Sequence, residues 1–130
     1  MNKYFIILIF SVLLFTLIGC SPNTITINEN NQNEKYSLKK DDNIEVILAA
    51  NPTTGFKWQI VNIDNSKIKL IDESYTAHKV NRDIVGSGGN KVYLFNTIDK
   101  GNTSIEFEYS RPFEKEATPY KIFNVNLDIR

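Results

Sequence analysis

Apolar and polar residues alternate along most of the chain from about residue 34 onward. The clearest case is the final segment, where four apolar residues share one face: Phe123, Val125, Leu127 and Ile129. A period of two residues indicates a β-strand with one buried face. The same pattern predicts strands over 34–38, 44–50, 56–63, 68–75, 91–97, 105–109 and 123–129.

These short strands are joined by polar turns, and beyond the first twenty residues no stretch of ten or more has helical periodicity. Such a series is typical of an antiparallel β-sandwich or a small barrel. We expect an all-β, immunoglobulin-like antiparallel β-sandwich of seven or eight strands. With 130 residues, the chain holds no more than one ordinary domain.

The first twenty residues follow a different pattern. Lys3 precedes an apolar run, residues 4–18, which is shorter than the ~20 residues of a spanning helix and fits a secretory signal. The run ends in Leu17-Ile18-Gly19-Cys20, which resembles the lipobox of bacterial lipoproteins. The resemblance implies cleavage before Cys20, lipidation of that cysteine, and an exported protein anchored to the cell membrane by lipid. The alternatives are an ordinary signal peptide with a stray cysteine, or an uncleaved anchor.

The expected organisation therefore has three parts. Residues 1–19 form the lipoprotein signal peptide, residues 20–33 the lipidated cysteine and a polar tether with a short strand at 24–27, and residues 34–130 the folded domain. Cys20 is the only cysteine, so no disulfide stabilises the domain. The net charge is +0, so nucleic acid is not an expected partner.

Few residues could support catalysis. His78 is the sole histidine and lacks the sequence context of a nucleophile elbow. The chain lacks the histidines and cysteines for a zinc site, and its glycine-rich stretch is not a phosphate-binding motif, so neither metal nor cofactor is expected. We predict that the chain is not an enzyme; the alternative, catalysis through His78 or Glu114, predicts turnover that is lost when either is changed.

Three unusual loops remain. Their residues are Asn51, Pro52, Thr53, Thr54, Gly55 and Phe56 in the first, Gly86, Ser87, Gly88 and Gly89 in the second, and Arg111, Pro112 and Phe113 in the third. The first combines a proline, a glycine and two β-branched threonines, which makes a stiff loop. In an immunoglobulin-like strand order, all three loops lie at one end of the sandwich. They would then form one contiguous rim, suited to binding a protein.

Taken in order, the three motifs resemble those of the chagasin family of cysteine peptidase inhibitors. The resemblance covers residues 34–130 and includes Trp58, two residues after the first motif. It departs from the family pattern at Phe56, where tyrosine is frequent, and at Phe113, where tryptophan is frequent. The second departure matters more, because it removes an indole ring that could stack on the enzyme.

The resemblance implies a reversible, non-covalent inhibitor that wedges three loops into the cleft of a papain-like cysteine peptidase, either host or endogenous. A monomer is the simplest expectation for its oligomeric state. Thr53 and Thr54 would approach the catalytic cysteine, residues 86–89 would lie along the substrate cleft, and residues 111–113 would pack on the opposite side. The alternative is a surface lipoprotein whose immunoglobulin-like domain serves adhesion or envelope structure. That alternative predicts no penalty for changing the loop tips.

Overall fold

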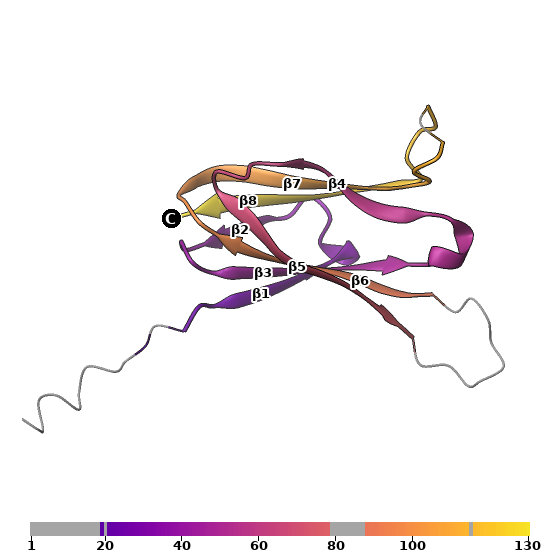
Figure 1. Cartoon of the computed structure of the whole chain (residues 1–130). Helices are drawn as coiled ribbons and strands as arrows, with labels where there is room; N and C mark the ends of the chain where they lie inside the picture. The colour runs from indigo at the N-terminus through magenta and orange to yellow at the C-terminus, as the bar shows by residue number, and fades with distance from the viewer. Residues whose placement is uncertain (1–18, 20, 79–87, 115) are drawn as a thin grey trace, which may run out of the picture.

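The computed structural model describes residues 19, 21–78, 88–114 and 116–130, and it is a sandwich of two four-stranded sheets (Figure 1). The strand order is β1-β3-β6-β5 in one sheet and β2-β8-β7-β4 in the other. The strands are β1 (Thr24–Asn28), β2 (Lys35–Leu38), β3 (Asn43–Ala50), β4 (Lys57–Ile63), β5 (Ile68–Ala77), β6 (Gly89–Thr97), β7 (Gly101–Ser110) and β8 (Lys121–Ile129). Two single-turn 3₁₀ helices, η1 (Glu29–Asn31) and η2 (Pro52–Thr54), complete the described elements.

The structure confirms the expected β-sandwich but differs from it in the direction of two strands. β1 pairs with β3, and β2 with β8, in parallel, whereas the four other pairings are antiparallel. The chain passes from β1 to β2 through η1 and so changes sheets. Each of the two strands then lies at the edge of its sheet, beside a strand that runs the same way, which a pattern of alternating residues cannot reveal.

The core lies between the sheets and is formed by the apolar faces that the alternation predicted. Its fully buried side chains include Tyr93, Phe95, Phe107, Phe123, Val125 and Leu127. Four aromatic rings of this core form a connected cluster, with centroids 5.1 Å apart for Tyr93 and Phe107 and 6.2 Å apart for Phe107 and Phe123. Burial of these faces stabilises the sandwich without covalent links.

The folded domain begins earlier than residue 34. The short strand expected within the polar tether is present as β1, residues 24–28, but it belongs to the sandwich, because the side chain of Ile27 is fully buried. Asn23 is also held, because its N–H donates to Oδ1 of Asp42 at 3.2 Å and its carbonyl accepts from the N–H of Asn43 at 2.7 Å. A chain that begins at Ser21 therefore retains every residue of both sheets.

The two ends of the sandwich differ. At one end, which we call the rim, lie the β3–β4 loop (residues 51–56), the β7–β8 loop (111–120) and the described ends of β5 and β6 (Figure 1). At the other end, which we call the base, lie the start of β1, the turn after β2 and the C-terminus (Figure 1). With β6 nine residues long, the rim and the base are about 30 Å apart.

Ile27→Ala should test whether β1 belongs to the domain. Removing a fully buried isoleucine side chain leaves a cavity between the sheets, which costs about 2–5 kcal/mol. The measurement is chemical denaturation of a chain that begins at Ser21. Thr24→Ala is the matched control, since Thr24 is exposed on the same strand and should change stability little. Equal stabilities of the two variants would show that β1 does not contribute to the core.

Candidate functional site

The β3–β4 loop at the rim crosses from one sheet to the other. It is not a hairpin, because β3 and β4 belong to different sheets. The short helix η2 makes the crossing. Its first residue is Pro52, whose ring fixes φ near the value of a helical turn. Gly55 ends η2 with a φ of 81°, a left-handed conformation that glycine adopts without strain. The sequence thus dictates a tight, well-terminated turn at the tip.

The side chain and carbonyl of Asn51 fix both threonines of this loop. Oδ1 of Asn51 accepts from the backbone N–H of Thr53 at 3.2 Å and from its hydroxyl at 2.6 Å. The hydroxyl of Thr54 donates to the carbonyl of Asn51 at 2.7 Å and accepts from the N–H of Phe56 at 3.4 Å. Pro52, Thr53 and Thr54 are all exposed, so the loop presents a tip whose conformation is set from within.

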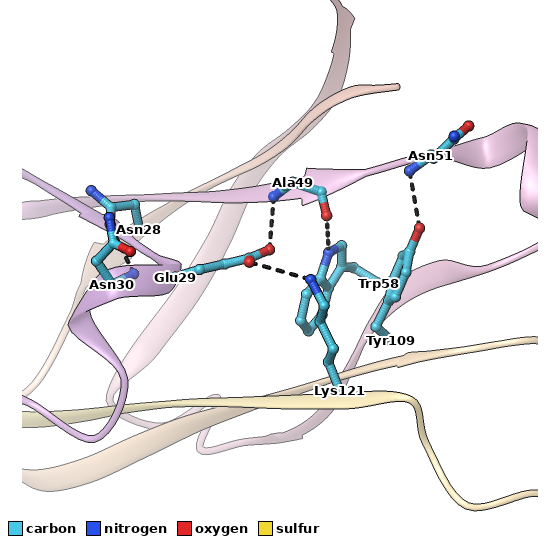
Figure 2. A network of polar contacts seen from close by, with 8 residues as sticks. All are labelled: Asn28, Glu29, Asn30, Ala49, Asn51, Trp58, Tyr109 and Lys121. Atoms are coloured by element: carbon cyan, nitrogen blue, oxygen red, sulfur yellow. Dashed lines mark hydrogen bonds and ion pairs between the residues drawn. The ribbon is translucent and has the colours of Figure 1, made fainter. Parts of the chain in front are cut away.

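Two buried aromatic residues of the other sheet hold the stem of the loop (Figure 2). The N–H of Asn51 donates to the hydroxyl of Tyr109 at 2.9 Å, and Nε1 of Trp58 donates to the carbonyl of Ala49 at 2.9 Å. The rings of Trp58 and Tyr109 are themselves 5.0 Å apart. The end of β3 is therefore fastened to β4 and β7 just before the chain turns into the loop.

The Tyr93 hydroxyl supports this arrangement from the core. It donates to the carbonyl of Trp58 at 3.0 Å. Burial, with a smaller contribution from the negative charge of Glu73, raises the pKa of Tyr93 above its usual value. The hydroxyl consequently remains a neutral donor throughout the physiological range of pH.

Phe56 closes the loop against a group of rings at the surface. The centroid of the Phe56 ring lies 5.4 Å from the ring centroid of Tyr109 and 5.5 Å from that of Tyr120. The guanidinium of Arg111 lies 4.5 Å from the Phe56 centroid. The side chain of Tyr120 is 70% exposed. Tyr120 belongs to none of the three sequence motifs; its position beside Pro119, directly before β8, is the one sequence signal that marks it.

The first and third loops contact each other through Arg111 and Phe113. Nε of Arg111 donates to the carbonyl of Thr54 at 3.3 Å, and its Nη1 lies 3.1 Å from Oε1 of Glu114. The ring of Phe113 packs against Gly55, where an added Cβ would lie 3.5 Å from it. Phe113 itself is 71% exposed. The structure thus brings the predicted residues 51–56 and 111–113 together.

Of the predicted second loop, Gly86 and Ser87 lie outside the described residues. Gly88 adopts a φ of 72°, and an added Cβ would lie 3.1 Å from the carbonyl oxygen of Ala50, so this end of the loop touches the stem of the first. Gly89 differs from the expectation, because it is buried in β6, paired with Ala50 on one side and Ala77 on the other. A side chain there would collide with the backbone of Thr76. Gly89 is therefore a packing residue of the sheet and not part of an exposed loop.

The described residues contain no cluster of three histidine, cysteine or carboxylate side chains that could hold a metal ion. His78 is exposed directly after the end of β5, and its backbone N–H donates to the carbonyl of Gly88 at 3.1 Å. The arrangement of the rim therefore suits surface contact, with a stiff tip flanked by exposed aromatic rings.

Comparison with known proteins places these features in a family. The sequence model of one protein family, described as Chagasin family peptidase inhibitor I42, matches residues 37–127 of this chain. Amoebiasin-1 of Entamoeba histolytica is 26% identical over 106 residues, which cover 82% of this chain and 100% of that protein.

Two solved structures share the fold. The cysteine protease inhibitor EhICP2 of Entamoeba histolytica has a TM-score of 0.78 and 24% identity, with 86% of this chain and 100% of that one covered. PbICP-C, solved in complex with falcipain-2, has a TM-score of 0.60 and 13% identity. The match covers 85% of this chain and 93% of PbICP-C.

Tyr109→Phe should loosen the stem of the first loop without unfolding the domain. The N–H of Asn51 loses its 2.9 Å acceptor, and a hydrogen bond of this kind contributes about 1 kcal/mol to stability. We expect a loss of that size in denaturation and faster amide hydrogen exchange at Asn51. In the control Tyr36→Phe, the lost hydroxyl contacts Glu34 in an exposed setting, so stability should change less. An unchanged exchange rate at Asn51 would contradict the role given to Tyr109.

Proposed function

Because the chain belongs to the chagasin family of peptidase inhibitors, as its three motifs predicted, we propose that it inhibits papain-like cysteine peptidases by inserting the rim into their active-site cleft. The same membership confirms the expectation that the chain is not an enzyme. It gives no support to the alternative of an adhesion or envelope module. The observation that carries the proposal is the exposed tip at residues 52–54, held in one conformation by Asn51.

A preset loop favours tight binding. Ordering a flexible loop on association costs free energy, whereas a loop already fixed by internal hydrogen bonds avoids most of that cost. Thr53 and Thr54 would face the catalytic cysteine of the peptidase. Their hydroxyls already bond to Asn51, and the tip presents only small side chains, so the block is steric and reversible.

The exposed rings beside the tip are suited to anchor the complex. Phe113 and Tyr120 are 71% and 70% exposed, and aromatic residues of this kind carry much of the binding energy at protein interfaces. Phe113 takes the position where the family often has tryptophan, and Tyr120, at the end of the same β7–β8 loop, adds a second ring beside Phe56. Arg111 contributes by holding the third loop against Thr54 and Phe56.

The proposal extends to the membrane. Cys20 would carry a lipid, as the lipobox resemblance implies, and only residues 21–23 separate it from β1. Three residues span about 10 Å at most, so the base would lie close to the lipid headgroups. The rim, at the opposite end of the sandwich, would then face away from the membrane (Figure 1). In the described part of the chain, no helix is long and apolar enough to cross a membrane.

Thr54→Asp tests the inhibitory role of the tip. A carboxylate placed in a desolvated cleft without a partner costs about 3 kcal/mol or more, so the inhibition constant for papain should rise by about 100-fold or more. Thr54→Val is the matched control, since it removes the same hydroxyl and keeps the β-branched shape. It should inhibit far better than Thr54→Asp, with both variants folded. Equal inhibition by the two would mean that residue 54 does not enter the cleft.

Cys20→Ser tests the membrane proposal independently. In a bacterial host supplied with labelled palmitate, the full chain should take up the label and the serine variant should not, because lipidation needs the thiol. The variant should still inhibit papain, since the rim is unchanged. Equal labelling of both proteins would contradict lipidation at Cys20.

A further inference from the structure

Glu29 lies between the stems of the first and third rim loops, although it is far from both in the sequence (Figure 2). Its Oε1 accepts from the backbone N–H of Ala49 at 2.9 Å, and its Oε2 lies 3.4 Å from Nζ of Lys121. Ala49 precedes the first loop by two residues, and Lys121 is the first residue of β8, directly after the third loop. One carboxylate thus touches both stems.

The carboxylate takes a place that the sheet leaves open. The β1–β3 ladder ends where Asn28 pairs with Ile47, so Ala49 lies beyond its last pair. At that point the chain turns into η1 under a capping box, in which Oδ1 of Asn28 accepts from the N–H of Asn30 and Oδ1 of Asn31 from the N–H of Asn28, both at 3.0 Å. This cap fixes the first residue of η1, Glu29, with its side chain directed at Ala49.

Side chains from two elements now hold both backbone polar groups of Ala49. Glu29 accepts from its N–H, and the indole of Trp58 donates to its carbonyl at 2.9 Å. The bond from an N–H to a charged carboxylate is of the stronger, charge-assisted kind. The contact with Lys121 is partly exposed on both sides, so it contributes less and serves mainly to align the third loop.

We propose that Glu29 is a positioning residue for the inhibitory rim: it fastens the stem of the first loop to that of the third, so that the rim meets a peptidase as one preset unit. The effect on inhibition rests on the proposed function, whereas the effect on the stem itself does not.

The test compares Glu29→Ala with Glu29→Gln in a chain that begins at Ser21. Alanine removes the acceptor for the N–H of Ala49, and glutamine keeps an amide oxygen in its place. We expect the alanine variant to speed hydrogen exchange at the Ala49 amide by about 10-fold or more and to raise the inhibition constant for papain by about 10-fold. The glutamine variant should restore both values to within about 3-fold of the original.

A spectroscopic signal reports on the stem directly. Trp58 is the only tryptophan, so its indole N–H gives a single, assignable proton resonance. This resonance should shift in Glu29→Ala, because the carbonyl that it donates to belongs to Ala49, and return in Glu29→Gln. Asp128→Ala is the control: Asp128 also pairs with a cation, Arg130, but lies near the base, so its loss should leave all three readouts unchanged.

The outcomes separate the two proposals. If no variant inhibits papain but exchange and the indole signal respond as expected, the proposed function fails and the positioning of the stem stands. If the original chain inhibits and Glu29→Ala does so equally well, with unchanged exchange, Glu29 does not position the rim. Should Glu29→Ala fail to fold, Glu29→Gln decides: an unchanged indole signal with full inhibition supports the positioning role, and loss of both overturns it.

Discussion

The rim depends on one constraint: a loop that crosses between two sheets leaves the hydrogen-bonding ladder of each. Past Ile47 the β1–β3 ladder has ended, and β3 keeps only its pairing with β6, which ends at Ala50. Side chains supply the hydrogen bonds that no neighbouring strand provides there. Glu29 and Trp58 bond to the backbone of Ala49, and Tyr109 bonds to that of Asn51. Together with the pairing of Ala50 and Gly89, these bonds hold the stem of the loop where the chain leaves β3.

This constraint also explains how stability and binding are divided among the residues. Trp58 and Tyr109 are buried, and their polar atoms form hydrogen bonds with the stem of the first loop. The small residues of the tip are exposed. Two strongly exposed rings, Phe113 and Tyr120, lie on the third loop and at its end. Buried aromatics thus set the geometry of the rim, and exposed aromatics offer it a surface for contact.

Much of this could be predicted from the sequence, because strand periodicity and loop composition are local signals. Phe123, Val125 and Leu127 are buried as their alternation predicted, and the first and third loops lie together at one end. β1 was harder to place, because one buried residue, Ile27, stands among polar neighbours and owes its position to pairing with a distant strand.

Other features could not be predicted, because they depend on which strands become neighbours. The parallel pairing of the edge strands β1 and β2 accompanies the change of sheet at η1. The burial of Gly89 follows from the close approach of Thr76 on β5. The contact between Glu29 and Lys121 joins residues 92 positions apart, and neither has a sequence context that suggests the other.

The most direct test of the central claim is the steady-state inhibition of papain by a chain that begins at Ser21, measured at several substrate concentrations. If the preset rim occupies the active-site cleft, inhibition should be competitive with substrate and reversible on dilution, and the inhibitor should be recovered uncleaved. Absence of inhibition at micromolar concentration, or inhibition that substrate cannot relieve, would contradict the account.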